Sequence, residues 1–319
     1  MFRLLQKSIL LQWLITLGLL LFSGYLVFQS TIVFTTDGYP LLYQELIRWI
    51  SNSSFWYRFW AFSSLMGTLT MIQIYFIKNK FLQKPSLLPS LFYLLFVITS
   101  GVIQKTDSIL ISNLMIMLIF ISNNTYFKTN SKSKLFYTGL FFGIAVLFDF
   151  ALIPLFIFII ISLIINTVIS PKALLILLYG ALTVVIYVVA MYYFTDHLGL
   201  LMENFRQIKI HTIFTTNIVI KPVHYVFIPF MMIIFIYILF KINAVYETKV
   251  IVLRKKMITF NTLVFCLLGT LLITHGNPTH FIGYLFVPMS MLFAIFSQFR
   301  SRFFIYDLLI IFFIVGLWF

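Results

Sequence analysis

The chain has 319 residues, of which 62% are hydrophobic and 9% are charged, with a formal net charge of +14. Soluble domains carry about 25% charged residues, so this composition excludes a water-soluble fold. The unbroken apolar runs exclude a transmembrane β-barrel, whose strands alternate polar and apolar residues. Because the Lys and Arg residues lie between the apolar runs and form no patch, the positive charge does not indicate a nucleic-acid partner. The composition predicts an all-α polytopic bundle in the lipid bilayer, whose helices satisfy their backbone polar groups internally.

The apolar runs are read as spans of roughly 17–25 residues, with shorter ones allowed where neighbours cover their ends. They predict a single integral membrane domain, residues 1–319, with about eleven helices. The expected positions are 8–28, 59–77, 86–103, 108–123, 135–148, 151–168, 172–194, 223–240, 257–274, 280–297 and 303–319. The first run has no small-residue cleavage site, so we interpret it as a retained helix and not as a signal peptide.

The stretch 135–168 is either one long tilted helix or two helices that meet in a tight hairpin at Asp149 and Pro154. The distribution of Lys and Arg among the loops favours the hairpin, because these residues in short loops are retained on the cytoplasmic side. With eleven helices and the N-terminus inside, 16 of the 22 Lys and Arg residues fall inside. These are Arg3, Lys7, Lys78, Lys80, Lys84, Lys128, Lys132, Lys134, Lys172, Lys241, Lys249, Arg254, Lys255, Lys256, Arg300 and Arg302. A single helix would move Lys172 and residues 254–256 outside.

The same orientation places six of the eight acids outside, namely Asp37, Glu45, Asp107, Asp149, Asp196 and Glu203. It also places two long loops there, residues 29–58 and 195–222. Each loop has apolar residues at helical spacing with polar residues opposite, which is typical of a helix lying in the membrane interface. These apolar residues are Leu42, Leu46, Trp49 and Ile50 in the first loop, and Leu201, Phe205 and Ile208 in the second. The inner connections 123–134 and 241–256 are expected to be polar, basic loops.

Catalytic motifs of soluble enzymes are missing from the sequence, so candidate chemistry lies at the outer face. Asp37 and Asp107 are carboxylates that could act as a general base on an acceptor hydroxyl. Arg206, Lys209 and His211 could hold the phosphates of a lipid-linked substrate and offset leaving-group charge. Two carboxylates could also hold a divalent metal ion that does the same.

Each candidate also has a structural interpretation. Asp37 can be a turn residue ahead of a helix that begins at Pro40, Asp107 can cap the fourth predicted helix, and Asp149 can mark the hairpin turn. The basic residues of the second outer loop can equally bind lipid headgroups. The aromatic residues Trp56, Tyr57, Trp60 and Tyr284 are interpreted as interfacial anchors.

Histidine and cysteine are not arranged for a metal centre or a disulfide. His275 and His280 flank a loop, and the other three histidines are scattered, which argues against a histidine-ligated iron site. The single cysteine, Cys266, lies inside an apolar run and excludes an intrachain disulfide. We interpret it as a packing residue.

A succession of features supports a family resemblance. Asp37 lies in a long outer loop, within residues 36–43, and Asp107 precedes an apolar helix. A basic inner loop follows, and then a helix with small residues at Gly139 and Gly143. Over residues 8–240 this arrangement resembles the GT-C membrane glycosyltransferases. A closer similarity links residues 139–150, 254–256 and 287–288 to a multi-pass membrane family of Bacteroidota whose function is unknown.

The GT-C resemblance implies transfer of a sugar from a polyprenyl-phosphate carrier at the outer face of the bacterial inner membrane. Asp37 matches the catalytic carboxylate of the first outer loop in that superfamily, and Asp107 matches the carboxylate of the second. Gly38 stands where a neighbouring acid usually follows the first carboxylate. The resemblance therefore implies either metal-independent transfer with one carboxylate or a scaffold that has lost catalysis.

Three functions follow as hypotheses. The first is a GT-C-like glycosyltransferase or a catalytically degenerate relative, and the second is a non-catalytic membrane subunit or scaffold. A transporter or flippase is the third, and it is disfavoured because few ionisable residues lie in mid-helix where a permeation path would need them.

Overall fold

The computed structural model describes residues 8–29, 54–79, 81, 86–100, 107–129, 131–166, 169–196, 198–199, 201, 236–237, 251–272 and 278–299. Every regular element in these ranges is helical, which confirms the all-α prediction for this part of the chain. The α-helices are α2 (Ile9–Gln29), α4 (Ser54–Asn79), α5 (Leu88–Thr99), α7 (Asp107–Thr129), α8 (Lys132–Phe148), α9 (Leu155–Ile165), α10 (Pro171–Phe194), α13 (Ile251–Leu268) and α14 (Pro278–Phe299). Two short 3-10 helices, η1 (Phe150–Leu152) and η2 (Gly269–Leu272), complete the described elements.

Nine of the predicted helices have a counterpart in this set. The predicted helices at 223–240 and 303–319 lie outside the described residues, except for Ile236 and Tyr237. The largest differences from the predicted boundaries are that α4 begins at Ser54, α7 continues to Thr129, and α13 extends from Ile251 to Leu268. Parts of the expected loops 29–58, 123–134 and 241–256 are thus helical. The length of an apolar run matches the thickness of the hydrocarbon layer, whereas the helix and its backbone hydrogen bonds can continue beyond that layer into polar sequence.

Three helices are long and apolar enough to cross a membrane: Ile9–Gln29, Arg58–Asn79 and Pro171–Phe194. The shortest of them has 21 residues, and at about 1.5 Å per residue it spans the roughly 30 Å of a hydrocarbon core. Shorter apolar helices occur at Leu88–Thr99, Ile109–Thr125, Phe150–Ile165 and Ile282–Ser297. These features mark the chain as a membrane protein.

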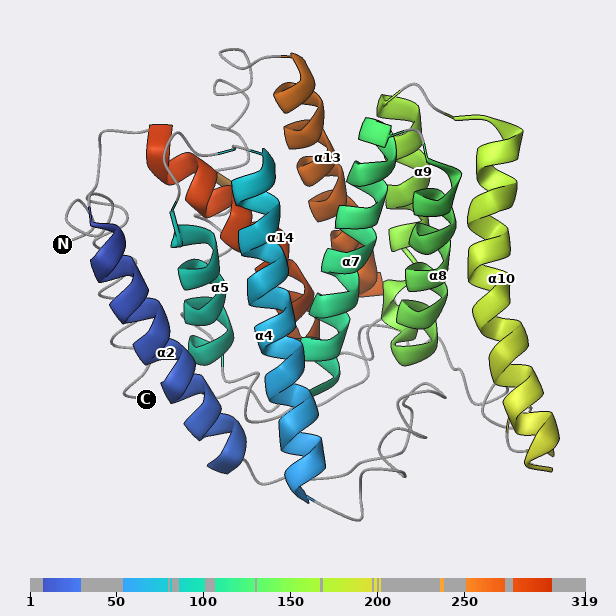
Figure 1. The fold of residues 1–319 in the computed structure, drawn as a ribbon, viewed down its shortest axis with the longest axis horizontal. Coiled ribbons are helices and arrows are strands. Elements are labelled where there is room, and N and C mark those ends of the chain that lie inside the picture. Colours follow the sequence, from blue (N-terminus) through green and yellow to red (C-terminus); the bar gives the residue numbers. More distant parts are fainter. Residues whose placement is uncertain are drawn as a thin grey trace.

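The helical path breaks at Asp149, as the two-helix reading of residues 135–168 predicts. Asp149 has extended backbone angles (φ −155°, ψ 106°), and η1 and Pro154 separate it from α9. Figure 1 shows α8 and α9 running in opposite directions. The long apolar stretch is therefore two helices and not one tilted helix.

The described helices run in both directions along the bundle, which therefore has two ends (Figure 1). At one end α2, α5, α8, α10 and α13 begin, and α4, α7, α9 and α14 finish. Hydrogen bonds join elements at this end. Lys256 Nζ of α13 donates to Asn79 Oδ1 at the end of α4 (2.8 Å), and the Leu87 N–H before α5 donates to Gln12 Oε1 of α2 (2.8 Å).

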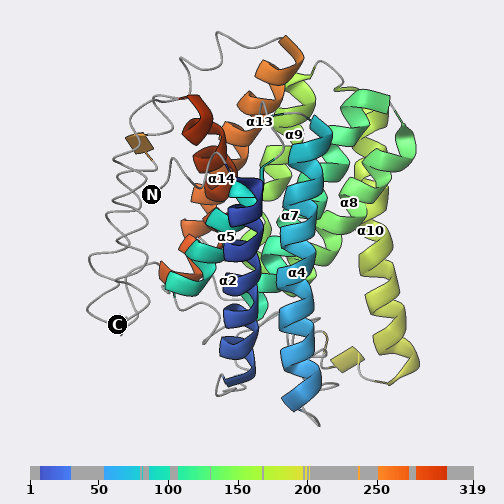
Figure 2. The ribbon, with the colours of Figure 1, turned by 60° about the vertical axis from the view of Figure 1, so that its left-hand side comes forward.

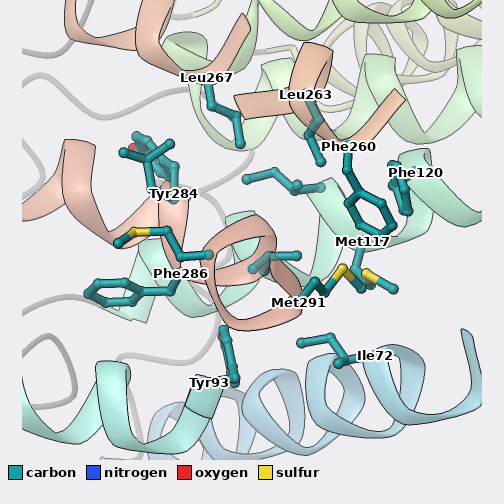
Figure 3. Close-up of a cluster of buried hydrophobic side chains, with 14 of the residues drawn as sticks. Ile72, Tyr93, Met117, Phe120, Phe260, Leu263, Leu267, Tyr284, Phe286 and Met291 are labelled. Atoms are coloured by element: carbon teal, nitrogen blue, oxygen red, sulfur yellow. The ribbon is translucent and has the colours of Figure 1, made fainter. Parts of the chain in front are cut away.

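The core lies between α4, α5, α7, α13 and α14. Figure 3 shows side chains from all five helices meeting there. The rings of Phe120 and Phe260 are 4.5 Å apart between centroids, and Tyr75 of α4 packs edge-on against both. By contrast, α10 lies at the margin of the bundle in Figures 1 and 2. Much of its surface is exposed and apolar, as expected of a helix that faces lipid.

Helix α10 is held mainly by α8, through glycines that allow the two backbones to touch. A Cβ atom built on Gly139 would lie 2.0 Å from the Leu177 carbonyl oxygen, and one on Gly143 would lie 2.9 Å from the Ala181 carbonyl oxygen. In the reverse direction, a Cβ on Gly180 would lie 2.3 Å from the Phe136 carbonyl oxygen. Close backbone approach at small residues is a common packing mode of membrane helices, where no hydrophobic effect drives the helices together.

Candidate functional site

Most of the predicted site residues fall outside the described ranges. Asp37, Arg206, Lys209 and His211 are among them, as is most of each long outer loop. Asp107 is the first residue of α7, and only its backbone position is described. Among the predicted site residues, the structure therefore places only Asp107.

The end of the bundle at which α7 begins carries the described acids, and we call it the acid end. Asp107 opens α7, Asp149 follows α8 and Asp196 follows α10 (Figure 1). Asp196 has a positive φ of 56°, a left-handed conformation that Asp tolerates at a helix C-terminus. Arg58, near the start of α4, also lies at this end.

The opposite end, which we call the basic end, carries the other described cations. They are Lys78, Lys128, Lys132, Lys134, Lys172, Arg254, Lys255 and Lys256. Within the described ranges no Asp or Glu lies at the basic end. The charged residues of these ranges thus lie within about two turns of a helix end, and the bundle is electrically asymmetric along its axis.

Asp149 is the centre of a polar cluster at the acid end. Its Oδ1 accepts a hydrogen bond from the Ala151 N–H (3.0 Å), which caps η1. Its Oδ2 accepts a bond from Ser112 Oγ of α7 (3.1 Å) and another from Tyr284 Oη of α14. Ser112 and Tyr284 are each only 1% exposed, whereas Asp149 is half-buried. One carboxylate therefore joins the α8–α9 turn to α7 and α14.

The position of Tyr284 corrects its interpretation as an interfacial anchor. The side chain is buried among the core residues of Figure 3, and its hydroxyl is bonded to Asp149. A pattern in the sequence is consistent with this burial, because 282–297 is apolar on all sides, as a buried helix is. A buried phenol needs a hydrogen-bond partner. Trp56 and Trp60 are 54% and 48% exposed, as anchors would be.

A second polar contact lies next to this cluster, deeper in the bundle. Asn113 Nδ2 donates to Tyr93 Oη of α5 (3.2 Å), and both side chains are fully buried. Asn113 Oδ1 has no hydrogen-bond partner among the described residues. Since Ser112 and Asn113 are consecutive on α7, polar contacts continue from the acid end toward the core.

Chemically, the Asp149 cluster fixes the beginning of α7. Ser112 lies five residues after Asp107, so its bond to Asp149 holds the first turns of the helix that Asp107 opens. The Asp149 side chain accepts hydrogen bonds from Ala151, Ser112 and Tyr284, which gives it a structural role. In the part of the chain that is described, no three His, Cys, Asp or Glu side chains gather into a group that could hold a metal ion.

The Tyr284–Asp149 bond predicts a measurable loss of stability. Tyr284→Phe should lower the free energy of unfolding by about 1.5–3 kcal/mol, the range for a hydrogen bond to a charged group. Tyr187→Phe is the matched control, because Tyr187 is 73% exposed on α10, and it should change stability by less than about 0.5 kcal/mol. The measurement is unfolding of the purified protein in mixed detergent micelles. Equal effects of the two variants would contradict a stabilising role for the bond.

Comparison of the chain with known proteins found no matching family profile, no match among curated proteins and no matching solved structure.

Proposed function

We propose that the chain is a GT-C-like glycosyltransferase, embedded in the bacterial inner membrane by about eleven helices. Its N-terminus faces the cytoplasm, and its acid end faces outside. The observation that carries the proposal is the separation of charge between the two ends. Cations are retained on the cytoplasmic side, so the basic end is the cytoplasmic one. The acid end, where Asp107 opens α7, is then outside.

The proposed reaction is transfer of a sugar from a polyprenyl-phosphate donor to an acceptor hydroxyl. Asp37 takes the proton of the acceptor as its oxygen forms a bond to the anomeric carbon. The bond between that carbon and the phosphate oxygen breaks, and the electron pair leaves with the polyprenyl phosphate. Arg206, Lys209 and His211 stabilise the charge that develops on the leaving phosphate. Asp107 is the second carboxylate of the site.

Three features of the described residues support this assignment. Asp107 lies at the same end of the bundle as Asp149 and Asp196, as a site in the outer leaflet requires. The Asp149 cluster holds the helix that Asp107 opens, and a catalytic carboxylate needs such support to keep its geometry. The helix with Gly139 and Gly143 packs closely on α10, and these are the small positions of the family resemblance.

A strain that lacks the chain provides the test of the proposed reaction. Its membranes should accumulate the polyprenyl-phosphate sugar and lose the glycan made from it, and the wild-type chain should restore both. The measurement is lipid and glycan profiling by mass spectrometry. Unchanged donor and glycan levels in the deletion strain would contradict transferase activity.

A non-catalytic membrane subunit is the second candidate, and the Asp149 cluster favours it. Both oxygens of this carboxylate accept hydrogen bonds within the fold: Oδ1 caps η1, and Oδ2 joins the α8–α9 turn to α7 and α14. A scaffold uses its buried polar groups in this way. The two candidates differ in the deletion strain, because loss of a scaffold lowers the amount of a partner protein without donor accumulation.

A further inference from the structure

Helix α5 carries polar contacts through the otherwise apolar interior of the bundle. The Tyr93 hydroxyl of α5 accepts a hydrogen bond from Asn113 Nδ2 of α7 (3.2 Å). One turn nearer the basic end, Ser90 Oγ donates to Gln73 Oε1 of α4 (3.0 Å). Tyr93, Asn113 and Ser90 are all buried. Polar groups inside a membrane bundle are costly, so each of these contacts calls for an account of its partners.

The amide of Asn113 is bonded at only one of its two ends. Its nitrogen meets Tyr93, whereas its Oδ1 accepts no hydrogen bond from any of the described residues. The side chain is fully buried, so bulk water does not reach this oxygen. Burying a carbonyl oxygen without a partner costs free energy, and most buried polar atoms in proteins are paired with protein or with ordered water. The bare oxygen therefore points to a ligand that donates a hydrogen bond inside the bundle.

The surroundings of Asn113 are polar on more than one side. The Thr68 side chain of α4, which is also fully buried, lies near the Tyr93 hydroxyl. Ser112 precedes Asn113 in α7 and donates to Asp149 at the acid end (3.1 Å). A buried water molecule needs roughly two to four polar partners, whereas a purely apolar cavity stays dry. These neighbours favour water as the donor that Asn113 requires.

We propose that Asn113 Oδ1 binds an ordered water molecule in the interior of the bundle, beside the contact between α5 and α7. The water donates one O–H to Asn113 Oδ1. A lipid headgroup or a large solute does not fit this position, because neither Asn113 nor Tyr93 is exposed. The proposal is independent of the transferase chemistry, and it makes the membrane interior of this protein locally wet.

Radiolytic labelling tests the wild-type chain directly. X-ray pulses convert bound water into hydroxyl radicals, which oxidise the side chains beside it even where they are buried. The full chain is purified in nonionic detergent micelles, and oxidation is measured for each residue by mass spectrometry. Tyr93 should be oxidised. Phe96 should not, because it is equally buried one turn further along α5 and packs against the rings of Phe286 and Phe293. Oxidation of Tyr93 no greater than that of Phe96 would overturn the proposal.

Two matched variants assign the water to Asn113. Asn113→Leu removes the amide and should reduce the oxidation of Tyr93 to the level of Phe96. Asn124→Leu makes the same change on the same helix, at a buried amide that donates to the Phe120 carbonyl oxygen (2.8 Å), and should leave Tyr93 oxidised as in the wild type. Unchanged oxidation of Tyr93 in the Asn113 variant would overturn the assignment, and so would an equal loss in both variants.

Discussion

Replacing Gly139 by alanine should destabilise the protein by about 3 kcal/mol, a large effect for one added carbon atom. The new Cβ would lie 2.0 Å from the Leu177 carbonyl oxygen, which belongs to the backbone of α10 and cannot rotate away. Relief requires the two helices to separate, and separation removes their other close contacts. We expect a lower unfolding midpoint in mixed detergent micelles and less protein in the membrane.

Gly18→Ala is the matched control for this prediction. No atom lies within 4 Å of a Cβ built on Gly18, which is also in a helix, α2. Alanine is favoured over glycine in a helix by about 1 kcal/mol, so this variant should be neutral or slightly stabilising. Gly180→Ala should behave like Gly139→Ala, because its Cβ would lie 2.3 Å from the Phe136 carbonyl oxygen. If the Gly139 and Gly18 variants were equally stable, the backbone contact between α8 and α10 would be refuted.

The second large effect concerns the proposed catalytic carboxylates. Expressed in the deletion strain, Asp37→Asn and Asp107→Asn should each fail to restore the glycan, because asparagine cannot accept a proton or carry the negative charge. Loss of a general base lowers a rate by about 10²–10⁴-fold. The measurement is the glycan profile at matched protein levels in the membrane.

Asp196→Asn is the control for these two variants. It removes a carboxylate from the same end of the bundle, and asparagine accepts the left-handed φ of 56° that Asp196 adopts. This variant should restore the glycan as the wild type does. Full restoration by the Asp37 and Asp107 variants would exclude the proposed roles and leave the scaffold as the better account.

The sequence predicted the described helices well, because apolar run length follows directly from membrane thickness. Their ends were less predictable. Residues 254–256 were expected in a loop, yet they belong to the first turns of α13. Charged residues do not stop a helix once it leaves the hydrocarbon. The break at Asp149 was predictable, since an acid and a proline in one apolar run disfavour a continuous helix.

The contacts of the site were beyond the reach of sequence patterns. Tyr284 and Asp149 are separated by 135 positions, and no periodicity relates α14 to the α8–α9 turn. Gly139 and Gly143 were recognisable as small positions, but their partner, α10, was not. For Asp107, the sequence allowed a catalytic or a capping role, and its position at the acid end is compatible with both. The remaining predicted site residues lie outside the described part of the chain.

Labelling of single cysteines in intact cells tests most directly whether the acid end faces outside. Cys266 is buried and is first replaced by alanine. Thr195→Cys then places a thiol at the acid end, after α10, and Ser133→Cys places one at the basic end, in the first turn of α8; both positions are exposed. A membrane-impermeant maleimide should label Thr195→Cys in intact cells and Ser133→Cys only after permeabilisation. Labelling of Ser133→Cys in intact cells, with Thr195→Cys protected, would contradict the orientation and the outer site built on it.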